Sequence, residues 1–179
     1  MAENNFLLAG FGGQGILFAG KVIAYAGLAD EKQVSWLPSY GPEMRGGTAN
    51  CSVCLSENVI GSPLVTEPNG FVAMNLPSFD KFIDSVEKDG VVIVESSLIE
   101  RKVERTDVRA FYVPATKIAE ENGLKGLANI ILIGKLWKET QFCTKDALVA
   151  GVKKSVPAKK AHLVDSNLKA LELGIAFEA

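Results

Sequence analysis

The stretch Leu7–Gly20, LLAGFGGQGILFAG, sets a short apolar run directly against a glycine-rich loop. The spacing of Gly10, Gly12 and Gly15 matches the G-x-G-x-x-G pattern, in which a strand ends, the chain turns tightly and a helix begins. The free N–H groups at the start of such a helix can bind a phosphate, and glycine lets a ligand approach the backbone. The stretch therefore predicts a strand–turn–helix unit with a candidate binding loop.

A dinucleotide site also needs an acidic residue at the end of the next strand, where it binds a ribose hydroxyl. Asp30 and Glu31 come before the next apolar stretch instead. That stretch, QVSWLPSYG, ends on Ser39, Tyr40 and Gly41. Because the ribose-binding acid is missing, a backbone anion site or a closely packed turn is favoured over an ordinary NAD or FAD site.

The composition is that of a globular domain. The chain has 179 residues, of which 47% are hydrophobic and 22% charged, and its formal net charge is −2. This balance does not suggest a nucleic-acid surface, and no apolar stretch approaches the roughly 18 residues of a membrane span. We expect a single domain over residues 1–179, in a cytoplasmic protein with no nucleic-acid or membrane partner.

Apolar runs typical of buried strands alternate with helix-compatible segments along the chain. Strands are expected near 6–9, 34–37, 49–55, 71–75, 90–96 and 110–115, and helices near 14–28, 76–88, 115–123 and 124–140, from about Lys145 and from about Ser166. Thr144 and Asp165 are the expected N-caps of the last two helices. The alternation predicts an α/β fold: a three-layer, Rossmann-like domain with a mainly parallel sheet and helices on both faces.

The connection Pro38–Thr48 is longer than two neighbouring strands need, and its prolines and glycines argue against a regular element. It starts, like the glycine loop, at the carboxyl end of a strand, where ligands of α/β sheets bind. Arg45 could bind a carboxylate or phosphate with its two-pronged guanidinium, or it could pair with Glu43 on the surface. The residues leave both possibilities open.

Metal ligands and nucleophiles are scarce. The three cysteines, Cys51, Cys54 and Cys143, cannot complete a four-thiolate site, and no Gly-x-Ser-x-Gly turn accompanies the single histidine, His162. Cys51 and Cys54 lie three apart on an expected strand, so they should point to opposite faces as buried thiols. The sequence therefore predicts no catalytic residue and no metal site on this chain.

The segment Leu127–Trp137 is apolar on nearly every face. Such a helix is buried either in its own fold or beneath a partner subunit. We expect the isolated chain to expose an apolar patch here, and it could then form homo-oligomers.

Four stretches together resemble a known family. AGFGGQGILFAGKVIAYAG, SWLPSYGPEMRGGTANCSVCLS, VPATKIAEENG and LANIILIGKL are similar to the gamma subunit of the 2-oxoacid:ferredoxin oxidoreductases, most closely the 2-oxoglutarate and branched-chain types. The resemblance implies one pyruvate:ferredoxin oxidoreductase gamma-type domain in a complex that converts a 2-oxoacid and coenzyme A (CoA) to acyl-CoA and CO2 and reduces ferredoxin. It also implies that thiamine diphosphate and the iron–sulfur clusters lie on the partner alpha, beta and delta subunits. This chain alone would then bind neither, and it would contact CoA.

The resemblance also indicates binding or interface positions, none of them bond-making. They are Gly10, Gly12, Gly13, Gln14 and Gly15 in the glycine loop, Tyr40, Gly41, Glu43, Arg45 and Gly46 in the signature loop, and Asn129 in a later block. Two alternatives remain beside a subunit of this complex: a free-standing Rossmann-type nucleotide-binding oxidoreductase, and an assembly module without a ligand.

Overall fold

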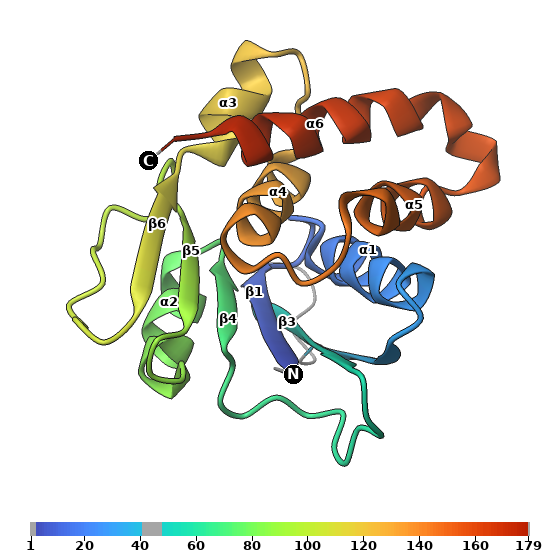
Figure 1. Cartoon of the computed structure of the whole chain (residues 1–179). Helices are drawn as coiled ribbons and strands as arrows, with labels where there is room; N and C mark the ends of the chain where they lie inside the picture. Colours follow the sequence, from blue (N-terminus) through green and yellow to red (C-terminus); the bar gives the residue numbers. More distant parts are fainter. Residues whose placement is uncertain (1–2, 41–47, 179) are drawn as a thin grey trace.

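A six-stranded sheet lies at the centre of the fold (Figure 1). The computed structural model of the chain describes residues 3–40 and 48–178. The strands are β1 (Asn4–Phe11), β2 (Gln33–Tyr40), β3 (Thr48–Ser56), β4 (Gly70–Ala73), β5 (Val91–Glu95) and β6 (Arg109–Val113). The α-helices are α1 (Ile16–Ala29), α2 (Leu76–Phe82), α3 (Ala115–Glu121), α4 (Ala128–Thr140), α5 (Lys145–Ser155) and α6 (Val164–Ala176). Two short 3-10 helices, Ile83–Ser85 and Ala158–Leu163, follow α2 and α5.

The strand order is β2-β3-β1-β4-β5-β6. The strands from β1 to β6 in this order, β1-β4-β5-β6, are all parallel to one another. β3 is antiparallel to both β1 and β2. The predicted mainly parallel α/β sheet is therefore confirmed. In register, Gly10 pairs with Ala49, which pairs in turn with Tyr40. The glycine loop and the connection after β2 thus begin at the same edge of the sheet, as expected.

Side chains alternate between two separate cores because successive residues of a strand point to opposite faces. In β1, Phe6 and Leu8 join the larger core, whereas Leu7 and Ala9 join the smaller one with Phe79 of α2. The larger core receives α1, α3, α4, α5 and α6. Helices on both faces are confirmed, but α6 lies over α4 and α5 and adds a tier beyond the three expected layers (Figure 1).

β2 is longer than the sequence predicts. It continues through Pro38 to Tyr40, so the expected irregular connection is wrong for these three residues, and residues 41–47 lie outside the described residues. Proline is compatible with this strand because β2 is at the edge of the described sheet, where one side of the strand needs no ladder hydrogen bond.

Two helix starts also differ from expectation. α4 begins at Ala128 rather than near Leu124, because Gly126 has a φ of +88° and interrupts the helix. Thr144 caps α5, as predicted, by accepting a hydrogen bond from the N–H of Ala147. The prediction for Asp165 was wrong: α6 begins at Val164, which places Asp165 in the first turn.

The apolar segment Leu127–Trp137 is buried by the chain itself. Residues Ile130–Ile133 have no exposed surface, since α4 lies between the sheet and α6. Large exposed apolar side chains among the described residues are elsewhere: Phe11, Leu28, Val59, Leu64, Leu76, Leu98 and Leu163. The predicted exposed patch on this segment was therefore wrong, because the sequence alone does not reveal that α6 covers it. Within residues 3–40 and 48–178, no helix is both long and apolar enough to span a membrane.

Candidate functional site

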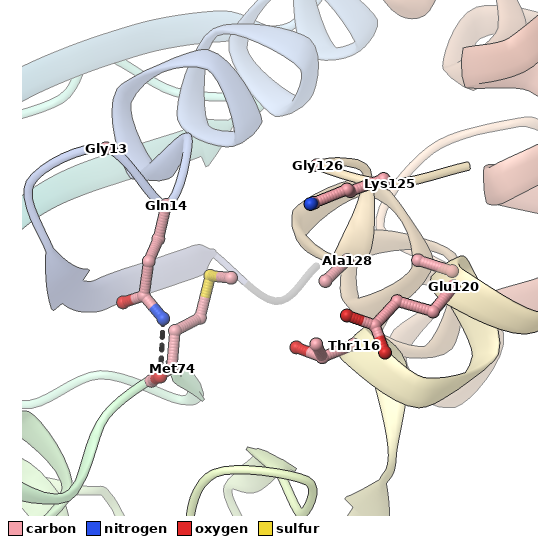
Figure 2. A pocket seen from close by; sticks show the side chains of 9 residues that line it. Gly13, Gln14, Met74, Thr116, Glu120, Lys125, Gly126 and Ala128 are labelled. Carbon is pink, nitrogen blue, oxygen red and sulfur yellow. Dashed lines mark hydrogen bonds between the residues drawn. The ribbon is translucent and has the colours of Figure 1, made fainter. Parts of the chain in front are cut away.

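Gln14 braces the glycine loop from within. Its Oε1 accepts a hydrogen bond from the N–H of Phe11 at 2.6 Å, and its Nε2 donates to the carbonyl of Met74 at 3.0 Å (Figure 2). The second contact ties the loop after β1 to the end of the neighbouring strand β4. The predicted binding residue Gln14 therefore holds the shape of the loop, and its Nε2 uses one of its two hydrogens in the contacts of the described residues.

The four glycines of the loop occupy different surroundings. Gly10 is buried, whereas Gly12 and Gly13 are exposed at the tip. Gly15 is the N-cap of α1, with a φ of +75° that favours glycine. The loop therefore presents its tip, and not its whole length, to an incoming ligand or partner.

Asn129 meets the loop from α4, although it lies far away in the sequence. Its Nδ2 donates to the carbonyl of Gly15 at 3.0 Å, and only 4% of the residue is exposed. Its Oδ1 is buried and has no hydrogen-bond partner among the described residues. The structure thus brings Asn129 together with the glycine loop, and it fixes the loop against α4. A direct contact of Asn129 with a ligand stays a prediction.

A pocket of about 270 Å³ opens beside the loop, at the carboxyl ends of β1 and β4. Figure 2 shows Gln14 and Met74 on one side and Thr116, Glu120 and Lys125 on the other. The full lining is Gly13, Gln14, Met74, Thr116, Ala119, Glu120, Lys125, Gly126 and Ala128. The floor is apolar and the rim carries one amine and one carboxylate, the usual design of a small-molecule site.

Most of the pocket residues were not predicted from the sequence. Thr116, Ala119 and Glu120 belong to the stretch VPATKIAEENG, so the resemblance marks the segment without naming them. Met74 and Lys125 carry no motif at all. They reach the site only because the ends of β4 and the α3–α4 connection fold against the glycine loop.

Behind the pocket, a buried carboxylate holds α3 in place. Glu95, the last residue of β5, has no exposed surface. Its Oε2 accepts from the N–H of Thr116 at 2.8 Å and from the Thr116 hydroxyl at 2.6 Å, and its Oε1 accepts from the N–H of Ser97 at 2.9 Å. Since α3 has no side-chain cap of its own at Pro114, Glu95 supplies one from the sheet.

The signature loop is mostly outside the described residues. Tyr40 ends β2 at the same edge as the glycine loop. Gly41, Glu43, Arg45 and Gly46 fall in the segment 41–47, so their predicted binding roles, and the alternative pairing of Arg45 with Glu43, remain predictions.

The described residues do not fit an iron–sulfur cluster. Cys51 belongs to the larger core, whereas the Cys54 sulfur points to the opposite face of β3, toward the carbonyl of Ser62, as predicted. No group of three or more potential metal ligands occurs among residues 3–40 and 48–178. The single histidine, His162, is exposed in the short helix after α5. The thiols are also held neutral, because burial raises the pKa of Cys51 and of Cys143 to about 12.

This burial predicts slow thiol chemistry. The folded chain at pH 8 should react slowly with iodoacetamide at Cys51 and Cys143, and urea-unfolded chain should alkylate quickly at all three cysteines, as mass spectrometry would show. The pKa of both thiols is higher in the folded state than the ordinary value of 9.0, so their contribution to stability is complete below pH 9. It should be lost as the pH rises toward 12. Rapid native alkylation of these two residues would contradict their burial.

The comparisons with known proteins point to one family. Residues 5–177 match the family described as pyruvate ferredoxin/flavodoxin oxidoreductase. Ketoisovalerate oxidoreductase subunit VorA of Methanothermobacter thermautotrophicus is 37% identical over 167 residues, which are 93% of this chain and 35% of that protein. The 2-oxoglutarate synthase subunit KorC of Methanocaldococcus jannaschii is 37% identical over 153 residues, covering 84% of this chain and 82% of the relative.

A solved structure has the same fold. The gamma subunit of a keto/oxoacid ferredoxin oxidoreductase from Geobacter sulfurreducens superimposes with a TM-score of 0.82 at 27% identity, over 96% of this chain and 95% of the other. The chain spans about a third of the length of the VorA relatives and most of the length of KorC. On the match over residues 5–177, the chain belongs to the pyruvate ferredoxin/flavodoxin oxidoreductase family.

Proposed function

We propose that this chain is the gamma-type subunit of a 2-oxoacid:ferredoxin oxidoreductase and that its pocket receives part of CoA, the acyl acceptor. The complex would convert a 2-oxoacid, with 2-oxoglutarate or a branched-chain 2-oxoacid as the first candidates, and CoA to acyl-CoA and CO2. Ferredoxin would take the electrons. The names of the VorA and KorC relatives favour these two substrate types.

The observation that carries the proposal is the position of the pocket. It lies at the carboxyl edge of the parallel strands, between the exposed tip of the glycine loop and the α3–α4 connection. Backbone N–H groups of the loop and the ammonium of Lys125 are suitable partners for phosphate oxygens. The apolar floor formed by Met74, Ala119 and Ala128 suits an uncharged portion of the same ligand.

The remaining chemistry falls to partner chains in this proposal. Thiamine diphosphate supplies the electron sink for decarboxylation, and iron–sulfur clusters carry the electrons. Because the cysteines of this chain do not fit a cluster, we assign these groups to the alpha, beta and delta subunits. The role left to this chain is to bind, orient and enclose CoA. The cytoplasm is the proposed location.

The alternatives are less well supported. A free-standing dinucleotide oxidoreductase would need a ribose-binding acid after β2, and the described end of that strand is Ser39 and Tyr40. An assembly module without a ligand would not need a pocket at the glycine loop. Membership of the pyruvate ferredoxin/flavodoxin oxidoreductase family supports the subunit role over these two alternatives.

Reconstitution tests the proposal. The purified chain alone should be colourless and should turn over no 2-oxoacid. The chain should be co-expressed with two chains encoded by neighbouring reading frames, one that binds thiamine diphosphate and one rich in Cys-x-x-Cys motifs. The three should give a stable complex that reduces ferredoxin when both 2-oxoacid and CoA are present. Turnover by the lone chain, or full activity of the partner chains without it, would refute the subunit role.

A further inference from the structure

The α3 side of the pocket has an unusual distribution of hydrogen-bonding groups. Thr116 and Glu120 lie one helical turn apart and both face the hollow (Figure 2). Glu120 offers carboxylate oxygens, which accept hydrogen bonds when ionised. A threonine hydroxyl can normally either donate or accept, so its role depends on where its single hydrogen points.

Glu95 decides that direction. Both of its oxygens accept backbone N–H groups, Oε1 from Ser97 and Oε2 from Thr116, so their lone pairs are directed at these two neighbours. The Thr116 Oγ1 lies 2.6 Å from Oε2 of Glu95. In this contact the Thr116 hydroxyl is the donor, and it has only one hydrogen to give. What the Thr116 oxygen can offer the pocket is therefore lone pairs alone.

We infer that Glu95 fixes Thr116 as a hydrogen-bond acceptor, so that the α3 wall of the pocket binds an amino or hydroxyl group of the ligand. The inference rests on the proposed function for the identity of that ligand, CoA. Glu95 is a positioning residue, because it acts through Thr116 and does not itself line the pocket. Thr116 is the specificity-determining residue.

This arrangement of donors and acceptors fixes the orientation of the bound ligand. Phosphate oxygens only accept hydrogen bonds, so the acceptors Thr116 and Glu120 repel them, whereas Lys125 and the glycine loop attract them. A molecule with an anionic group and a separate donor group fits in one orientation only. In CoA the donor is either the adenine amino group or a hydroxyl of the ribose or pantothenate portion.

The test uses the reconstituted complex with CoA and 2-oxoacid varied separately. Thr116→Val removes the acceptor with little change in volume, and we expect it to raise KM for CoA about tenfold without changing kcat or KM for the 2-oxoacid. Thr116→Ser retains the hydroxyl and should stay within about twofold of the wild type. Glu95→Ala frees the hydroxyl to rotate and should raise the same KM, and Glu95→Gln should raise it as well, because its amide NH2 must face one of the N–H donors that the two oxygens of Glu95 accept.

A matched control separates this effect from a loose helix. The Ser97 hydroxyl accepts a hydrogen bond from the N–H of Lys117 at 3.3 Å and so braces α3 without lining the pocket. Ser97→Ala should leave KM for CoA unchanged. Equal losses in Ser97→Ala and Thr116→Val would indicate a merely structural role and would overturn the inference, as would an unchanged KM in Thr116→Val.

The ligand arm uses 1,N6-etheno-CoA, in which the adenine amino group is blocked. If the donor is that amino group, the wild type should lose affinity for the analogue and Thr116→Val should lose nothing further. If the donor is a hydroxyl, wild type should bind the analogue like CoA, and Thr116→Val should weaken both ligands equally. Lack of CoA-dependent turnover in the wild-type complex would instead refute the proposed function and remove CoA as the ligand.

Discussion

Replacing Gly174 with alanine is expected to destabilise the chain by roughly 3–4 kcal/mol, although alanine normally favours a helix over glycine by about 1 kcal/mol. A Cβ at Gly174 would collide with the carbonyl oxygen of Ile131 and would come within 3.1 Å of the Cα of Gly134. These are backbone atoms of α4, so α6 can accept the methyl group only by moving away. That movement would uncover α4, which carries Asn129 and thereby supports the glycine loop.

Urea unfolding measured by circular dichroism gives the size of this effect. Gly61→Ala is the control, because a Cβ there meets no heavy atom within 4 Å and should change the free energy of unfolding by less than about 0.5 kcal/mol. A Gly174→Ala chain as stable as Gly61→Ala would show that α4 and α6 do not approach as closely as described.

Gly15→Ala should cost about 2–3 kcal/mol and should also distort the binding loop. Two causes add: the φ of +75° is strained for alanine, and the new Cβ would collide with the Asn129 carboxamide. Gly13 offers the strain without the collision, since its φ is +95° and a Cβ there meets nothing within 4 Å. Gly13→Ala should therefore cost only about 1–2 kcal/mol.

A double-mutant cycle identifies the collision. In an Asn129→Ala background the cost of Gly15→Ala should fall to that of Gly13→Ala, because the clashing carboxamide is gone. Strict additivity of the two substitutions would mean that Asn129 does not contact Gly15 in the folded chain.

The strand–turn–helix at Leu7–Gly20 was predictable because its signals are local: an apolar run, glycines that permit a tight turn, and a helical pattern directly after it. The placement of β3 between β1 and β2 was not. Its apolar residues indicate a strand, but they do not specify whether its partners run parallel or antiparallel. The burial of Leu127–Trp137 was predicted in part. A helix that is apolar on every face must be covered, but the sequence does not show that α6 covers it.

The candidate site divides in the same way. The glycine loop and Asn129 were marked as separate positions by motifs, and the hydrogen bond that joins them is known only from the fold. Thr116 and Lys125 were not, because packing between distant segments makes them neighbours of Gln14. Glu95 did carry a signal: an acidic residue ends the otherwise apolar run GVVIVES, and a buried carboxylate needs donors nearby. That signal predicts a contact, yet its partner, 21 residues away, is known only from the fold.

The central claim is that the pocket beside the glycine loop receives CoA, and charge reversal at Lys125 tests it most directly. Lys125 is exposed at the pocket rim, so Lys125→Glu should leave folding and assembly intact. In the reconstituted complex we expect KM for CoA to rise about tenfold, with kcat and KM for the 2-oxoacid unchanged, since a second carboxylate beside Glu120 repels the CoA phosphates. Lys159→Glu, an equal charge change at an exposed residue that does not line the pocket, should have no effect on any of these constants. A KM for CoA that is the same in Lys125→Glu, Lys159→Glu and the wild type would contradict the assignment of this pocket to CoA.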